Sequence, residues 1–156
     1  MQYVVQFAIG LGILVVVAFG VMGWWSGHRS EPVLGVHAGQ LSACPASPNC
    51  VSSESGSGNT EQSTVNTIAL PDADTERHWQ VLLDTVRAHG GAIQVQDGDY
   101  VHATFTSAVF RFIDDLELRR EGRIVHVRSA SRVGHSDLGA NRKRVAAIQL
   151  AFNSGG

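Results

Sequence analysis

Arginine is the residue type through which this chain could recognise a ligand. Eleven of its twelve basic residues are arginine, and nine of the twelve lie between positions 111 and 144. That window also holds five acidic residues, so its formal charge is +4, while the remainder of the chain carries −6. A guanidinium group presents a planar fork of N–H donors that matches a carboxylate or a phosphate. The pattern predicts either an anion-binding surface or a network of arginine–carboxylate pairs inside the protein.

The stretch RSASRVGHSDLGANRKR, residues 128–144, is the strongest candidate for an anion site. Ser136 or Asn141 could cap a final helix there, and the N-terminus of a helix attracts anions through its free N–H groups. The sequence contains no Gly-x-x-x-x-Gly-Lys-Ser/Thr phosphate loop and no Gly-x-Ser-x-Gly nucleophile elbow. The candidate ligand-binding residues are Arg111, Arg128, Ser129, Ser131, Arg132, Asn141, Arg142 and Arg144.

Asp114 interrupts an otherwise apolar strand face. In residues 110–118, FRFIDDLEL, alternation places Asp114 on the same side as two phenylalanines and two leucines. A carboxylate on such a face must be paired, because burying it alone costs many kcal/mol. Arg128 and Arg132 are the nearest candidates, and an ion pair between Asp114 and Arg128 is the expected one.

An enzymatic alternative uses Asp114, His126 and His135 as hydrolytic or metal-binding groups. Scattered histidines are more often ordinary core or surface residues, and Asp114 and Asp115 are adjacent, so on a strand they face opposite sides. We therefore expect a non-enzymatic protein and assign no catalytic residue, metal or cofactor. A structural or partner-binding domain of the cell envelope is a third possibility, and nucleic acid is not an expected partner.

The two cysteines predict a disulfide outside the core. Cys44 and Cys50 lie in CPASPNC, a short loop with two prolines, and the chain has no other cysteine. Such a pair suits an oxidising compartment and an extracytoplasmic domain. Reduced loop thiols are the alternative, and a zinc site would need two further ligands that no local spacing supplies.

Residues 3–25 predict a membrane-spanning helix. The segment has no charged residue, and 23 helical residues extend roughly 34 Å, enough to cross a hydrocarbon core of about 30 Å. Trp24 and Trp25 stand where an interfacial aromatic belt would lie. Because no Lys or Arg precedes the segment, a retained anchor is favoured over a cleaved signal peptide. Arg29 is the one basic residue near the segment, and by the positive-inside rule it favours a cytoplasmic domain. The cysteines favour the extracytoplasmic side.

The positions of turn signals and apolar residues divide the chain into three parts. Residues 1–27 form the anchor, 28–67 a connector with the cysteine loop and a flexible Ser/Gly-rich stretch at 52–67, and 68–156 the folded domain. Apolar spacing predicts a helix between Pro71 and Gly90, and a second over 136–152. Strands are expected at 93–95, 100–105, 110–118 and 123–127. The prediction is an α+β domain, with about four antiparallel strands and two helices on one face.

Three blocks of the sequence resemble the signature regions of the domain-of-unknown-function family DUF1499. They are CPASPNCVSS at 44–53, SAVFRFIDDLELR at 107–119 and IVHVRSASRVGHSDLGANRKRV at 124–145. The resemblance implies a bacterial, membrane-linked protein, and it brings no established activity, substrate or cofactor. Together with the residues above, it predicts a single-pass protein of the bacterial inner membrane. Its domain is expected on the extracytoplasmic side, where it would bind an anionic ligand or lipid headgroup through arginines.

Overall fold

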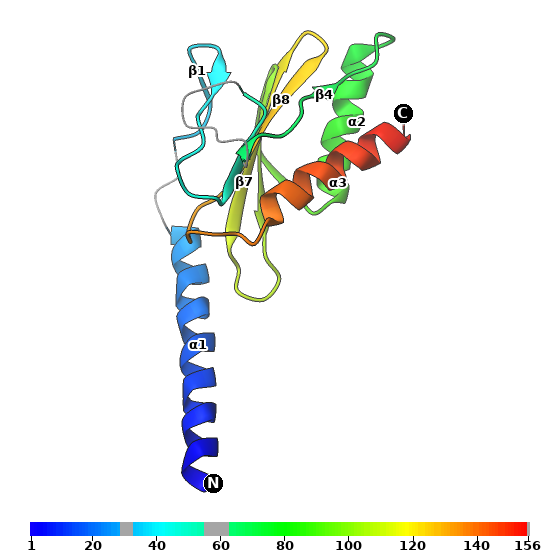
Figure 1. Ribbon diagram of the computed structural model, residues 1–156. Helices are drawn as coiled ribbons and strands as arrows, with labels where there is room; N and C mark the ends of the chain where they lie inside the picture. Colours follow the sequence, from blue (N-terminus) through cyan, green and yellow to red (C-terminus); the bar gives the residue numbers. More distant parts are fainter. Residues whose placement is uncertain (29–32, 55–62, 156) are drawn as a thin grey trace.

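A long helix and an α+β domain make up the chain (Figure 1). The computed structural model describes residues 1–28, 33–54 and 63–155. The long helix, α1 (Gln2–His28), is apolar and long enough by composition to span a membrane, and its most apolar window is not buried by the rest of the chain. The domain holds the remaining helices and all the strands.

The domain is built on an antiparallel sheet of six strands. Four of them follow one another as hairpins: β5 (Ala92–Asp97), β6 (Tyr100–Thr106), β7 (Ile113–Glu121) and β8 (Ile124–Ser131). Two short strands, β3 (Cys50–Ser52) and β4 (Ile68–Ala69), both pair with β8, so that the order is β3-β8-β7-β6-β5 with β4 beside β8. A separate two-stranded hairpin consists of β1 (Val36–His37) and β2 (Gln40–Leu41). The α+β prediction is confirmed, although the sheet has more strands than the four expected.

Helices α2 (Thr75–Ala88) and α3 (Ala140–Gly155) pack on the same face of the sheet (Figure 1). Asp74 caps α2 by accepting a hydrogen bond from the backbone N–H of Arg77 at 3.2 Å. The predicted apolar stripe of α2 is buried against the sheet, together with one face of α3. The buried residues are Trp79, Leu82, Leu83 and Val86 on α2 and Val145, Ile148 and Phe152 on α3.

The final helix begins four residues later than predicted, at Ala140. The Asp137 carboxylate accepts hydrogen bonds from the backbone N–H groups of Gly139 and Asn141, at 2.9 and 2.8 Å. The expected cap by Ser136 or Asn141 is therefore wrong, and the protein's own carboxylate occupies the helix N-terminus. Leu138, which falls inside the helix predicted over 136–152, lies in the preceding turn and is 88% exposed.

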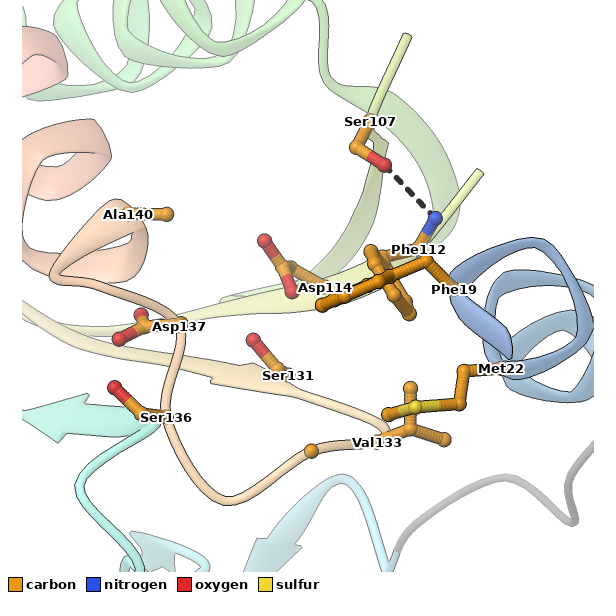
Figure 2. Close-up of a pocket in the computed structure, with 11 residues that line it drawn as sticks. Phe19, Met22, Ser107, Phe112, Asp114, Ser131, Val133, Ser136, Asp137 and Ala140 are labelled. Carbon is orange, nitrogen blue, oxygen red and sulfur yellow. Dashed lines mark hydrogen bonds between the residues drawn. The ribbon is translucent and has the colours of Figure 1, made fainter. Parts of the chain in front are cut away.

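The strand expected over 110–118 begins only at Ile113. Arg111 has a φ of 60°, in the left-handed region, which ends the extended run. Residues 107–112, which we call the β6–β7 loop, lie against α1 instead, and Phe112 stands beside Phe19 (Figure 2). From Asp114 onward the predicted alternation holds, because Leu116 and Leu118 on the same face are buried in the core.

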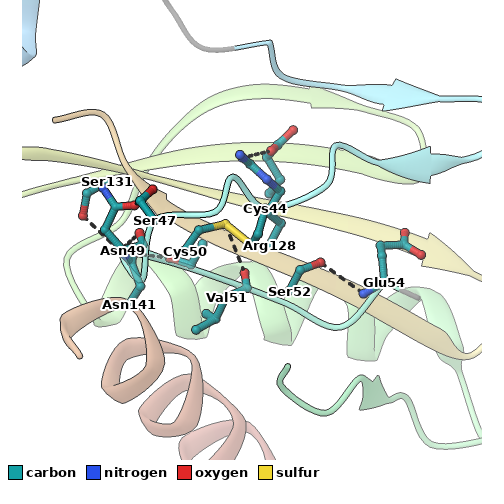
Figure 3. Close-up of a disulfide and its surroundings, with 12 residues drawn as sticks. Cys44, Ser47, Asn49, Cys50, Val51, Ser52, Glu54, Arg128, Ser131 and Asn141 are labelled. Carbon is teal, nitrogen blue, oxygen red and sulfur yellow. Dashed lines mark hydrogen bonds and ion pairs between the residues drawn. A yellow bond between two sulfur atoms is a disulfide. The ribbon is translucent and has the colours of Figure 1, made fainter. Parts of the chain in front are cut away.

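The face of the sheet away from the helices is covered by residues 33–54. This segment was expected to be a connector, but β3 lies within it and joins the main sheet. Cys44 and Cys50 form the predicted disulfide, with Cα atoms 5.6 Å apart, and both are buried (Figure 3). Of the stretch predicted to be flexible, residues 55–62 lie outside the described residues, whereas Glu54 before them is buried.

Removing the disulfide with the double substitution C44S/C50S is expected to destabilise the domain by about 2 kcal/mol, the chain-entropy value for so short a loop. The measurement is urea unfolding of the full chain in detergent, followed by circular dichroism, with the wild type under reducing conditions as a second comparison. An unfolding midpoint equal to that of the oxidised wild type would contradict a stabilising role for the bond.

Candidate functional site: a buried charged face beneath the cysteine loop

The candidate site is the sheet face opposite the two helices, where charged side chains lie buried. The strand register places Glu117 of β7 between His102 of β6 and Arg128 of β8. Asp115 and Arg119, two residues away in each direction, point to the same side. We call this group the charged face. Its members are Glu54, Tyr100, His102, Asp115, Glu117, Arg119, His126, Arg128 and Arg132.

Glu117 and Arg128 form an ion pair at the centre of the charged face. Glu117 is fully buried and Arg128 is 5% exposed, and the Nη1 of Arg128 donates to Oε2 of Glu117 at 2.8 Å. The other carboxylate oxygen accepts from the Tyr100 hydroxyl at 2.9 Å and from the backbone N–H of Gly35 at 2.7 Å. Burial and the neighbouring Glu117 charge raise the pKa of Tyr100, so its hydroxyl stays a donor.

The Asp115 carboxylate is held by the side chains of Arg132 and His102. The Nε and Nη2 of Arg132 donate to its two oxygens at 3.0 and 2.8 Å, and Nε2 of His102 lies 2.8 Å from Oδ1. Burial works against ionisation of this carboxyl, but the hydrogen bonds from His102 and Arg132 outweigh it and lower its pKa. Asp115 is therefore an ionised, fully partnered carboxylate at neutral pH.

Glu54 connects the covering segment to the strands. Its carboxylate accepts from Nε of Arg119 at 2.9 Å and from the backbone N–H of Leu41 at 3.2 Å. His126 approaches the same carboxylate, with Nδ1 3.3 Å from Oε2. One buried acid thus ties β2, β7 and β8 together from a position just after β3.

A polar pocket of about 260 Å³ opens beside this network, between the cysteine loop and the turn after β8. Arg128 lies on its floor beneath the disulfide (Figure 3). The Nε of Arg128 is buried and has no hydrogen-bond partner among the described residues. Other polar groups that line the pocket are Ser47, Asn49, Asp115, Ser131, Arg132 and the Gly134 backbone.

A second pocket, of about 240 Å³ and mostly apolar, lies next to α1 (Figure 2). Phe19 and Met22 of α1 form one wall, and Phe112 contributes from the β6–β7 loop. The two pockets share the lining residues Ser131, Val133 and Gly134, so only the turn after β8 separates them. An amphiphilic molecule could therefore contact α1 and the polar pocket at once.

The predicted ligand-binding residues fall into separate groups rather than one cluster. Ser129, Asn141 and Arg144 form a hydrogen-bonded set on the helix side of the sheet, with Ser129 Oγ 2.6 Å from Oδ1 of Asn141. Arg128 and Arg132 lie on the charged face. Arg142 donates to the carbonyl of Thr64 at 3.0 Å. The Ser131 hydroxyl accepts from Nδ2 of Asn141 at 3.0 Å and lines both pockets, and Arg111 lies in the β6–β7 loop.

The partner of Asp114 is Arg144, with Nη2 2.6 Å from Oδ2. The need for an arginine partner was predicted correctly, but the expected pair with Arg128 is wrong. Asp114 is in register with Ser131, whereas Arg128 is in register with Glu117, an odd number of residues away along each strand. The two side chains therefore emerge from opposite faces of the sheet.

The residues of the enzymatic alternative are not gathered in one place. Asp114 faces the helices, His126 lies on the charged face next to Glu54, and His135 is exposed in the turn before α3. Across residues 1–28, 33–54 and 63–155, no group of three or more His, Cys, Asp or Glu side chains is placed to hold a metal ion.

The sequence did not identify Glu54, Tyr100 or Glu117 as site residues. On the strands, charged residues alternating with apolar ones resemble an ordinary solvent-facing side. The available signal was the cysteine loop, because a disulfide-closed segment ahead of the sheet needs a surface to pack on. Nothing local to the strands indicated that this surface is their charged side.

Replacing Glu117 with alanine is expected to destabilise the domain by about 3–5 kcal/mol, because it leaves the Arg128 guanidinium buried without its counter-ion. The matched control is E121A, on the same strand and face, whose carboxylate is 71% exposed and pairs with Arg119. This control is expected to change stability far less, since solvent screens the pair. Urea unfolding of both full-length variants in detergent measures the difference, and equal midpoints would contradict the burial of the Glu117–Arg128 pair.

The free energy of unfolding is expected to decrease as the pH is lowered, because Asp115 becomes protonated. Its pKa is lowered in the folded state, so its contribution is fully present above the unfolded value of about 4 and is lost as pH falls through the folded value. Wild type and D115N are therefore expected to differ most at neutral pH, and their free energies of unfolding should converge below about pH 4. A difference that stays constant down to pH 2 would show that the pKa of Asp115 is not lowered in the folded protein.

Comparison with known proteins is informative at the level of the family. None of the curated proteins searched matches the chain. A family model described as "Protein of unknown function (DUF1499)" matches residues 40–152, which include the cysteine loop, all the strands of the main sheet and most of α3. The chain therefore belongs to the DUF1499 family.

Proposed function

We propose that this protein is a single-pass component of the bacterial inner membrane whose extracytoplasmic domain binds a small anionic group in the polar pocket. The membrane part of the proposal is supported by α1, whose residues 3–25 are uncharged and exposed along nearly their whole length. The sidedness is supported by the Cys44–Cys50 disulfide, because such bonds persist in oxidising compartments.

The observation that carries the anion proposal is the unpartnered Nε of Arg128. A buried N–H donor without an acceptor costs about 1–3 kcal/mol, so folded proteins rarely leave one unsatisfied. Arg128 lines the polar pocket, and Arg132 and Ser131 lie in the same lining. Nε itself is closed off from the pocket, so a small movement of the lining must expose it. An oxyanion in the pocket would then supply the missing acceptor and could engage a second guanidinium.

The charge balance defines what kind of binding to expect. Glu117 and Asp115 already compensate Arg128 and Arg132, so the pocket is not a strongly basic surface. Recognition would depend on directed N–H and O–H donors in a partly desolvated site rather than on long-range attraction. A carboxylate or phosphate group fits this requirement, with a weaker salt dependence than an exposed arginine cluster would give.

A lipid headgroup is one source of such an anion, and a free ion in the periplasm is another. The lipid source is supported by the apolar pocket, which places Phe19 and Met22 of α1 on the other side of the turn that lines the polar pocket. An acyl chain along α1 and a headgroup under the cysteine loop would use both pockets together.

The test is binding of inorganic phosphate, short-chain phosphatidylglycerol and short-chain phosphatidylcholine to the full chain in nanodiscs, measured by calorimetry. R128K is the informative variant, because lysine keeps a cation opposite Glu117 but lacks the Nε–H donor, and we expect a loss of affinity of about tenfold or more. The matched control is R123K, since Arg123 pairs with Asp72 on the surface, away from the pocket.

Binding of both phosphate and phosphatidylglycerol, reduced by R128K alone, would support a pocket for the oxyanion itself. Binding of phosphatidylglycerol only would support the lipid source. If neither anion binds, or if R128K and R123K behave alike, Arg128 is a structural residue and the anion proposal is wrong.

A further inference from the structure

We infer that the β6–β7 loop inserts into the bilayer beside α1, so that the domain is seated on the membrane surface and not merely tethered to it. The proposed partner is the lipid bilayer, at the level of its interface and outer hydrocarbon. The inference rests on the membrane-spanning role proposed for α1, and it is independent of any ligand in the polar pocket.

Aromatic contacts join the loop to the part of α1 that lies within the uncharged segment. The ring centroid of Phe19 is 5.2 Å from that of Phe110 and 6.4 Å from that of Phe112. One helical turn further along α1, Gly23 faces the loop backbone so closely that an added Cβ would overlap the carbonyl oxygen of Phe110. The absence of a side chain at position 23 is therefore what admits the loop.

A hydrogen bond fixes the base of the loop to the end of α1. The fully buried Ser26 hydroxyl accepts from the backbone N–H of Ile113, the first residue of β7, at 3.0 Å. Together with the Phe19 contacts, this bond holds the loop along about two turns of α1. The loop therefore runs beside the helix instead of projecting away from it.

The position of Phe19 in the helix sets the depth of the loop. Phe19 precedes Trp24 by five residues, or about 8 Å along the helix axis. Trp24 and its neighbour Trp25 mark the expected water–membrane interface, so side chains that pack on Phe19 must lie below the interface. Any bilayer position of α1 that buries residues 3–25 thus also buries the tip of the loop.

The composition of the loop suits that environment. Its sequence is SAVFRF, and Val109 at the tip is 78% exposed in the isolated chain, where lipid would cover it. The neck of the loop closes on itself, because the Ser107 N–H donates to the Phe112 carbonyl and the Phe112 N–H donates to the Ser107 hydroxyl, both at 2.9 Å. Satisfying backbone groups internally is a requirement in hydrocarbon.

Arg111 is the one charged residue of the loop. Among the described residues no hydrogen bond or ion pair to its side chain is found, and it is exposed. An arginine at this depth extends its guanidinium toward the phosphate layer while its aliphatic stem stays in the apolar region. Arg111, one of the predicted ligand-binding residues, is thus assigned to the membrane surface.

The inference can be tested with single-cysteine labelling of the full chain. The only two native cysteines are joined in the disulfide, so V109C provides one reactive thiol for an environment-sensitive fluorophore. In liposomes that contain nitroxide-labelled lipid, the probe at V109C is expected to be quenched strongly. The matched control is D97C, an exposed position at the opposite end of the β5–β6 pair, where quenching should be slight.

A probe at I13C, in the middle of α1, separates failure of the loop from failure of the anchor. If I13C is quenched and V109C is quenched no more than D97C, the loop does not enter the bilayer and the inference is overturned while the anchor stands. If I13C is not quenched either, the membrane-spanning role of α1 fails and the inference fails with it. Adding G23L to V109C is expected to lower its quenching several-fold, because the leucine displaces Phe110; unchanged quenching would contradict the seat on α1.

Discussion

The buried ion pair between Glu117 and Arg128 cannot exist on an open sheet surface, since it is dry only when another segment lies over it. Residues 33–54 provide that cover and take part in the pairing, through the Gly35 N–H on Glu117 and the Glu54 carboxylate on Arg119. The disulfide and the β3–β8 pairing hold the cover in place. The charged face and its cover therefore depend on each other: the cover keeps the ion pair out of water, and the buried polar groups of the face hold the cover in place.

The uneven distribution of charge along the sequence is resolved by contacts between distant segments. Arg119, Arg120 and Arg123 lie in the basic window, and each pairs with acids from outside it: Glu54, Glu76, Asp99 and Asp72. Most of the arginine excess thus serves internal pairing, the second of the two possibilities raised by the composition. The planar guanidinium suits this role because it can satisfy two acceptors at once, as Arg120 does with Glu76 and Asp99. Among the arginines of the described residues, the buried Nε of Arg128 has no hydrogen-bond partner, and Arg111 is exposed.

Arg128 lines the polar pocket beside the turn after β8, and Arg111 lies in the β6–β7 loop next to α1, in the region where the domain meets the helix. The polar pocket, the apolar pocket and the β6–β7 loop are contiguous there, since Phe112 and Ser131 both line the apolar pocket. Ser26 and Gly23 make the contact possible, one by hydrogen bonding and the other by lacking a side chain. With α1 in the membrane-spanning role proposed above, a ligand in this region would be recognised at the membrane surface, and α1 would form part of the site.

The sequence by itself determined the parts that depend on local order. The uncharged segment 3–25, the apolar stripe of α2, the hairpins around Gly98 and Gly122 and the pairing of two cysteines follow from composition and spacing, because helix and turn chemistry act over a few residues. Tertiary structure decided the partners. Strand alternation required that Asp114 be paired, but only the β7–β8 register and the position of α3 select Arg144 over Arg128. Which side of the sheet is covered, and hence which charges are buried, depends on contacts more than 60 residues apart, such as Glu54 with Arg119. A strand with alternating charged and apolar residues has the same sequence pattern whether its charged side faces water or a covering segment. Only the packed structure distinguishes the two.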